Sequence, residues 1–354
     1  MNITHTKIIG LLFIVCITLG CSNEQPPQQE TNQISEITID SVDIETFTDF
    51  ETHDIAQPSE IEVFDDGTVT IADFGQRKVA LVEPNGELIT SFGREGRGPG
   101  EFIRISNIFS TGDVIHVVDT DQSIIAQFDQ DGNFLANHTF ESEAIMPEVA
   151  AVDQNKYVIA AGGTKNSLLS VTDFTTDSTF YFGTPNGESV ETADLQASLN
   201  QLKSGEIPNL FKNMVTLRSD GDHIYAYLRA FSELRKYDTS GNLIWEQSLD
   251  LPYNEEIFNA TVENAKNSPG GLPFYNYITD FEIINQEIVI LTNRSQTNDS
   301  QLLVRLNESG EATAIYTPAA HLGYLSAFDW NANNDMIYLA SYSDGVVYSS
   351  QVPF

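Results

Sequence analysis

Short runs of apolar residues, bounded by turns that contain glycine, recur along most of the chain. Four segments share one order: a strand, a loop, a second strand, a tight turn and a third strand. Their tight turns contain Asn85-Gly86, Asp131-Gly132, Ser240-Gly241 and Ser309-Gly310. In each pair the glycine supplies the positive φ angle that a hairpin turn requires. The pattern therefore predicts a repeated antiparallel β unit.

Two weaker units, in 149–187 and 325–354, bring the number of units to six. The last unit shows only three strands, while strand-like residues at 37–40 and 42–44 belong to no unit. We expect this N-terminal strand to join the last unit, because that pairing closes a ring and removes the exposed sheet edges. The predicted fold is an all-β, six-bladed β-propeller of four-stranded antiparallel blades over residues 37–354.

Two stretches depart from the repeat and have the spacing of helices, 190–202 and 255–265. They are too few to cover a parallel sheet, so we interpret them as insertions near 188–214 and 253–280. Long propeller loops often carry function. Tyr275 and Tyr277 in the second insertion are therefore candidate ligand-binding residues. The alternative is that these aromatic side chains pack the insertion against its blade.

The N-terminus has the features of a lipoprotein signal peptide. Lys7 precedes an apolar run at 8–19, which is too short to span a bilayer as a helix and ends just before Cys21. This segment resembles a lipobox, which implies a signal peptide at 1–20 and a lipid on the Cys21 thiol. Residues 21–36 are polar and predict a flexible tether. We expect a protein that is anchored to a membrane and does not span it.

Charge and cysteine content restrict the partners. The chain has 17 Lys and Arg against 51 Asp and Glu, a formal net charge of −34. Nucleic acid is therefore an unsuitable partner, and anionic headgroups would repel the protein. The chain has two cysteines, Cys16 in the signal peptide and Cys21. The predicted propeller thus has neither a disulfide nor a cysteine-ligated metal.

The segment 91–102 (SFGREGRGPGEF) is the most distinctive motif. It resembles the link between blades in NHL-type and TolB-like propellers, and in particular the six-bladed propeller lipoproteins of Bacteroidetes. The resemblance implies an envelope protein, and we expect an outer-membrane lipoprotein that faces the periplasm or the cell surface. It implies no particular activity, since one fold hosts many functions.

Arg94 and Arg97 in this motif are candidate ligand-binding residues. Arginine on a loop can bind an anionic group, such as a carboxylate, through two hydrogen bonds. The alternative is that both arginines pair with neighbouring acids such as Glu95 and Glu101, and so stabilise the junction between blades.

The sequence offers two candidate metal sites, one of aspartates and one of histidines. Asp73, Asp119 and Asp121 follow predicted strands, but two or three acids from separate blades are too few for Ca²⁺, and they more often accept hydrogen bonds in turns. The histidines of alternate units, His116, His223 and His321, occupy mismatched positions in the repeat. We therefore predict no resident metal and no cofactor.

Our functional prediction is a monomeric, non-catalytic propeller lipoprotein that binds a small ligand or an envelope protein. The alternative is a Ca²⁺-dependent, lactonase-like hydrolase or lyase, which requires oxygen ligands that converge on the mouth of the propeller.

Overall fold

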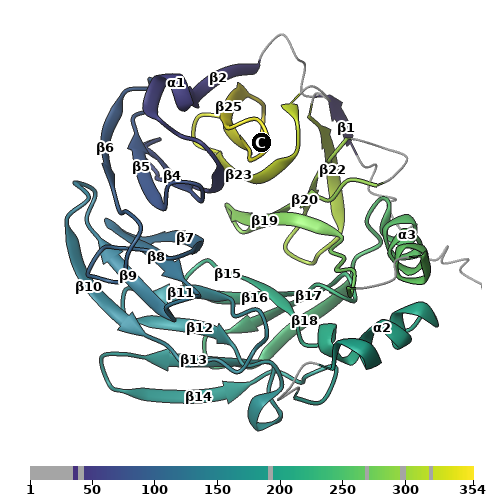
Figure 1. Ribbon diagram of the computed structural model, residues 1–354. Coiled ribbons are helices and arrows are strands. Elements are labelled where there is room, and N and C mark those ends of the chain that lie inside the picture. Colours follow the sequence, from purple (N-terminus) through teal and green to yellow (C-terminus); the bar gives the residue numbers. More distant parts are fainter. Residues whose placement is uncertain (1–34, 39–43, 190–193, 268–270, 296–299, 319–321) are drawn as a thin grey trace, which may run out of the picture. The chain divides into compact units, whose positions relative to one another are not determined.

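A computed structural model of the chain describes residues 35–38, 44–189, 194–267, 271–295, 300–318 and 322–354. Their strands form six sheets, and the innermost strand of each sheet contacts those of its neighbours around a common axis (Figure 1). Each blade contains four antiparallel strands. In five blades these strands are consecutive along the chain, and in the last blade one strand is supplied by the N-terminal part of the chain. The predicted six-bladed β-propeller is confirmed.

The first three blades follow one another along the chain, each from its innermost to its outermost strand. The first blade contains β3 (Pro58–Val63), β4 (Val69–Asp73), β5 (Lys78–Val82) and β6 (Leu88–Phe92). The second contains β7 (Ile105–Thr111), β8 (Val114–Asp119), β9 (Ile124–Phe128) and β10 (Phe134–Thr139). The third contains β11 (Val149–Asp153), β12 (Lys156–Ala160), β13 (Leu169–Asp173) and β14 (Ser178–Phe182).

The remaining blades continue in the same order. The fourth contains β15 (Val215–Ser219), β16 (His223–Leu228), β17 (Glu233–Asp238) and β18 (Leu243–Ser248). The fifth contains β19 (Ile278–Ile284), β20 (Glu287–Thr292), β21 (Leu303–Leu306) and β22 (Ala312–Thr317). The sixth contains β23 (Leu325–Asn331), β24 (Met336–Ser341) and β25 (Val346–Gln351).

The ring is closed by β2 (Ile44–Asp49), which pairs antiparallel with β25 as the outer strand of the sixth blade. The predicted closure by the N-terminal part of the chain is thus confirmed. Of the expected segment 37–44, Ile44 begins this strand, 39–43 lie outside the described residues, and Ile37 and Thr38 join another blade. β1 (Ser35–Thr38) runs parallel to β22 instead and adds a fifth strand to the fifth blade. It therefore covers an edge that would otherwise expose unpaired backbone groups. Ser35 and Glu36, which composition assigned to the tether, belong to this strand.

Each junction between neighbouring blades contains one cluster of buried apolar side chains. Phe102 and Phe128 lie in the cluster between the first and second blades, and Phe281 lies in the one between the fourth and fifth. All three are exposed by 2% or less. Burial of one such side chain contributes about 1.5–3 kcal/mol, so these junction clusters are the main stabilising feature of the ring.

The predicted hairpin turns are confirmed in four blades. Gly86, Gly132, Gly241 and Gly310 have φ angles between 79° and 87°, in the region that glycine tolerates best. The turn expected at 185–187 in the third unit was misplaced. In that blade the two outer strands meet at 174–177, where Asp177 adopts the positive φ angle, and 185–187 follows β14.

The connections carry three α-helices and two 3₁₀ helices within the described residues. These are α1 (Phe50–His53), η1 (Thr164–Asn166), α2 (Leu195–Lys203), η2 (Asn209–Phe211) and α3 (Asn254–Asn267). α2 and α3 confirm the two helical insertions, and they contact each other beside the fourth and fifth blades (Figure 1). None of the helices within the described ranges combines the length and apolar character needed to cross a membrane. The predicted signal peptide and Cys21 lie outside these ranges.

Candidate functional site

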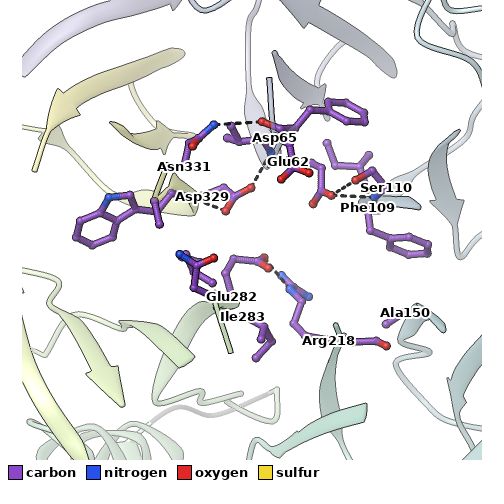
Figure 2. A pocket seen from close by; sticks show the side chains of 18 of the residues that line it. Glu62, Asp65, Phe109, Ser110, Ala150, Arg218, Glu282, Ile283, Asp329 and Asn331 are labelled. Atoms are coloured by element: carbon purple, nitrogen blue, oxygen red, sulfur yellow. Dashed lines mark hydrogen bonds and ion pairs between the residues drawn. The ribbon is translucent and has the colours of Figure 1, made fainter. Parts of the chain in front are cut away.

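A cavity of about 230 Å³ lies at the centre of the ring, where the innermost strands end and turn outward (Figure 2). Its lining comes from the innermost strands of all six blades and the turns that follow them. Charged and polar side chains dominate this lining: Glu62, Asp65, Asn107, Ser110, Arg218, Glu282, Asp329 and Asn331. The cavity is therefore the place where chemistry-bearing residues from distant parts of the chain meet.

A β-bulge shapes the start of the innermost strand in four blades. A serine or threonine marks each bulge: Ser59, Ser106, Thr279 and Ser326. Its hydroxyl donates a hydrogen bond of 3.1–3.5 Å to a carbonyl oxygen of the neighbouring strand. A bulge bends a strand and changes where the following side chains point. The third residue after each bulge lines the cavity: Glu62, Phe109, Glu282 and Asp329.

Arg218 on β15 is engaged by groups of the protein. Its Nε donates to Glu282 Oε1 at 2.7 Å, its Nη2 donates to Asp280 Oδ1 at 2.5 Å, and its Nη1 donates to the Leu217 carbonyl at 3.0 Å. All three side chains of this ion-pair group are largely buried. The guanidinium thus neutralises two acids of the fifth blade, and three of its five N–H donors are engaged by groups of the protein.

The other acids around the axis connect neighbouring blades. Glu62 of the first blade accepts hydrogen bonds from the backbone N–H and the hydroxyl of Ser110 in the second, at 2.9 and 2.5 Å. Asp329 of the sixth blade accepts from the Val63 N–H of the first at 2.6 Å. Asp280 of the fifth accepts from the Phe328 N–H of the sixth at 3.2 Å. These three carboxylates therefore connect neighbouring blades, and Glu62 and Asp329 also line the cavity.

Burial changes the protonation of these groups. It raises the pKa of Glu62 and of Glu282, and it raises the pKa of Asp329 to about 8, with the negative charge of Glu62 adding to the effect on Asp329. Each of these carboxyl groups has lost part of its hydration. A positive charge in the cavity would favour their ionised forms.

Arg94 and Arg97 lie on the connection between β6 and β7, outside the cavity. Arg94 Nε and Nη2 donate to Glu101 Oε1 at 2.8 and 2.6 Å, and Glu101 Oε2 also accepts from the Gly98 N–H at 2.8 Å. The motif therefore folds around Glu101. Arg94 pairs with this neighbouring acid, which is the arrangement given above as the alternative to ligand binding. The Arg97 side chain is exposed.

Tyr275 and Tyr277 also lie outside the cavity. They are 4% and 7% exposed, and the Tyr275 hydroxyl donates to the Ala230 carbonyl at 3.3 Å. Their rings pack in the cluster that joins α2 and α3 to the blades, where Tyr275 contacts Phe211 and Phe258. This arrangement matches the packing alternative.

The candidate metal ligands are engaged in other ways. Asp73 and Asp119 are 1% and 0% exposed, and both accept several backbone hydrogen bonds in turns. His116 is buried between Thr111 and Tyr157, with burial lowering its pKa to about 3. His223 binds Asp220, and His321 lies outside the described residues. Within the described ranges, no group of three His, Cys, Asp or Glu has the arrangement to hold a metal ion.

The cavity residues Glu62, Arg218, Glu282 and Asp329 were missed by the sequence analysis. A signal for three of them was present: Ser59-Glu60-Ile61-Glu62, Thr279-Asp280-Phe281-Glu282 and Ser326-Ala327-Phe328-Asp329 share the order hydroxyl, any residue, large apolar, acid. The spacing supports the pattern, since Ser59 and Ser106, like Thr279 and Ser326, are 47 residues apart. The hairpin glycines mark the turns between outer strands, so they carry no information about the side chains at the axis.

Comparison with known sequences agrees with this architecture. The profile of a protein family described as 6-bladed beta-propeller matches residues 27–233, more than half of the chain. No curated protein matches the sequence.

Solved structures resemble this chain at low identity. An exported protein from Bacteroides fragilis is 12% identical, with 90% of this chain and 98% of that chain covered and a TM-score of 0.52. A gluconolactonase from Xanthomonas campestris is 11% identical, with 88% and 89% covered and a TM-score of 0.49. Virginiamycin B lyase from Staphylococcus aureus is 12% identical, with 87% and 99% covered and a TM-score of 0.49. At these identities the likeness concerns the fold alone.

Proposed function

This chain belongs to the 6-bladed beta-propeller family, and from this we propose that it is a lipid-anchored envelope protein whose axial cavity binds a ligand without catalysing a reaction. The observation that carries the proposal is the cavity itself, to which all six blades contribute lining residues. Concave sites with a few converging polar groups are the usual place for ligands. We propose that the protein acts as a monomer in the outer membrane and faces the periplasm or the cell surface.

The anchor part of the proposal depends on Cys21. The Bacteroides fragilis protein of the same fold is described as exported, which agrees with an N-terminal signal. The full chain and a Cys21→Ser variant would be expressed in a bacterial host fed an alkyne-labelled fatty acid. We expect label and membrane sedimentation for the wild type and neither for Cys21→Ser. Equal labelling of both proteins, or an unlabelled wild type, would show that no lipid is attached at Cys21.

The binding part is tested with a variant that fills the cavity. Ala151 lines the cavity and is 8% exposed, so Ala151→Leu adds volume there with little disturbance of charge. Thermal shifts would be recorded for the wild type and the variant against a panel of amines, amino acids, sugars and organic acids. We expect at least one compound that stabilises only the wild type. If no compound does so, or if every active compound stabilises both proteins equally, the axial assignment fails.

The alternative function is a Ca²⁺-dependent, lactonase-like hydrolase or lyase. Asp119 and Asp73, the acids first considered as metal ligands, are occupied by backbone donors. Metal analysis of the purified protein, with lactone hydrolysis measured before and after chelation, separates the two functions. A stoichiometric metal that supports turnover would replace the binding proposal with the enzymatic one.

A further inference from the structure

We propose that the axial cavity takes the ammonium group of a lysine side chain presented by a basic peptide segment of a partner protein. The inference extends the proposed function, since it depends on the cavity being the binding site and names the chemistry of its ligand. Three properties of the molecule support it: unengaged acceptors in the cavity, the size of the cavity, and the distribution of charge over the face that surrounds it.

The cavity offers acceptors, and its one guanidinium already pairs with two acids of the protein. Glu62 Oε2, Glu282 Oε2 and Asn107 Oδ1 accept no hydrogen bond from any described residue, although the other polar atoms of these three side chains are engaged. Asn107 is 5% exposed and lines the cavity, so its oxygen is an almost buried acceptor without a donor. A lysine ammonium has three donors and no acceptor.

An anionic ligand fits these groups poorly. Arg218 is the one basic side chain in the lining, and each of its three nitrogens already donates to a group of the protein. An acid in this cavity would face Glu62, Glu282 and Asp329, and the one guanidinium there already has two carboxylates as partners. A positive group would favour the ionised state of these carboxyls, whose pKa values burial has raised.

The size of the cavity favours a single side chain. Pockets that enclose a whole drug-sized ligand have volumes of roughly 300–1,000 Å³. A cavity of about 230 Å³ lies below that range and suits one small group. A larger partner would therefore insert one side chain and rest its remaining surface on the surrounding face.

We use "cavity face" for the turns at the end of the propeller where the cavity opens: 64–68, 83–87, 112–113, 129–133, 154–155, 174–177, 220–222, 239–242, 285–286, 307–311 and 332–335. These turns contain no Lys or Arg. They contain eleven exposed acids: Asp65, Asp66, Glu83, Glu87, Asp113, Asp131, Asp177, Asp220, Asp222, Glu308 and Glu311. Such a field attracts a basic segment and speeds its encounter with the cavity.

The opposite face carries charges of both signs, with sixteen acids in the described part of its connections. Its connections hold ten basic residues: Arg77, Arg94, Arg97, Arg104, Lys165, Lys203, Lys212, Arg229, Lys266 and Arg294. The low number of basic residues in the whole chain therefore does not explain their absence from the cavity face. The described turns of the cavity face have acids without bases, whereas the opposite face mixes both signs, so the cavity face is the end better suited to a cationic partner.

The test is calorimetric titration of the full-length protein in detergent with tetralysine at about 50 mM salt, where screening of exposed charges is limited. Three variants would be compared with the wild type. Glu62→Gln removes a cavity charge, Ala151→Leu fills the cavity, and Glu87→Gln is the matched control, because Glu87 is exposed on the same face outside the cavity. Thermal unfolding verifies that each variant is folded.

We expect tetralysine to bind the wild type, and Glu62→Gln and Ala151→Leu to weaken binding at least tenfold. Glu87→Gln should change the affinity less than twofold, and tetralysine acetylated on its side chains should not bind. Butylammonium, the free small-molecule source of the same group, should bind at least tenfold more weakly than tetralysine. Equal affinity for both probes would show that the acidic turns contribute nothing and would overturn the peptide assignment.

Two further outcomes overturn the inference in distinguishable ways. If tetralysine fails to bind while Ala151→Leu abolishes the binding of a neutral or acidic compound, the cavity is a site but not one for cations. If tetralysine binds and Ala151→Leu does not weaken it, the acidic surface alone attracts the peptide, and the axial assignment under the proposed function fails with it.

Discussion

The axial cavity and the helical insertions lie at opposite ends of the innermost strands, and they differ in what they bury. α2 and α3 lead into the amino-terminal ends of β15 and β19, and there Leu199, Leu202 and Tyr275 pack in one apolar cluster. The cavity lies at the carboxyl-terminal ends of the same strands and buries Arg218 with the acids around it.

The two regions differ in what their burial contributes to stability. Removal of apolar surface from water contributes about 25 cal/mol per Å², so burial of the insertion cluster stabilises the fold without the need for a charged or hydrogen-bonding partner. Burial of charges costs free energy unless every partner is in place. A group of partly desolvated carboxyls is therefore the reason that we propose the cavity as the functional end, while the tyrosines of the insertion pack in its apolar cluster.

Removal of Arg218 should have the largest effect on stability. Arg218→Met retains most of the side-chain volume but leaves Asp280 and Glu282 without their counter-charge, which we expect to cost about 3–5 kcal/mol. Urea unfolding measures the change. Arg305→Met is the control, because the Arg305–Glu287 pair is about one quarter exposed and should contribute less than about 1 kcal/mol. A similar loss of unfolding free energy in both variants would contradict the larger contribution that we assign to the buried ion pairs of Arg218.

Truncation of the insertion core should have the next largest effect. Tyr275→Ala opens a cavity between α3 and the blades and should lower the free energy of unfolding by about 3 kcal/mol, while tetralysine binding remains unchanged. Its neighbour Phe274 is 45% exposed, so Phe274→Ala should cost less than about 1 kcal/mol. If the folded Tyr275→Ala variant no longer binds tetralysine, the insertion takes part in binding and the assignment of the site to the cavity is contradicted.

The smallest effect should come from pH. Asp329 has an ordinary unfolded pKa near 4 and a folded pKa of about 8, so its neutral form stabilises the fold. This contribution is complete below pH about 4 and is lost as pH rises through about 8, with a slope of at most about 1.4 kcal/mol per pH unit. Glu62 and Glu282 shift in the same direction.

Unfolding free energies between pH 7 and pH 9 test this prediction. His116 does not interfere in that window, because its pKa is about 3 when folded and near 6.5 when unfolded. We expect stability to fall across the window in the wild type and to fall less in Asp329→Asn. A wild type whose stability is constant or rises from pH 7 to pH 9 would contradict the protonated state assigned to Asp329.

Local patterns in the sequence accounted for most of the fold. Gly86, Gly132, Gly241 and Gly310 mark the hairpins because each turn requires a positive φ angle, whichever blade it belongs to. The helical spacing at 190–202 and 255–265 likewise indicated α2 and α3. The assignment of β1 was wrong, because 35–38 and 44–49 are both short strand-like segments and only tertiary contacts select the edge that each one joins.

The sequence by itself determined the repeated hairpins, the number of blades and the acidity of the chain, since these depend on neighbouring residues and on composition. Only the tertiary structure decided which acids meet. Glu62 and Asp329 are separated by most of the chain, and closure of the ring brings both to one cavity with Arg218. Likewise, the sequence left open whether Tyr275 and Tyr277 bind a ligand or pack the insertion against its blade, and only the tertiary structure shows both buried in the cluster with α3. Burial and long-range pairing are properties of the closed ring, so no local pattern could specify them.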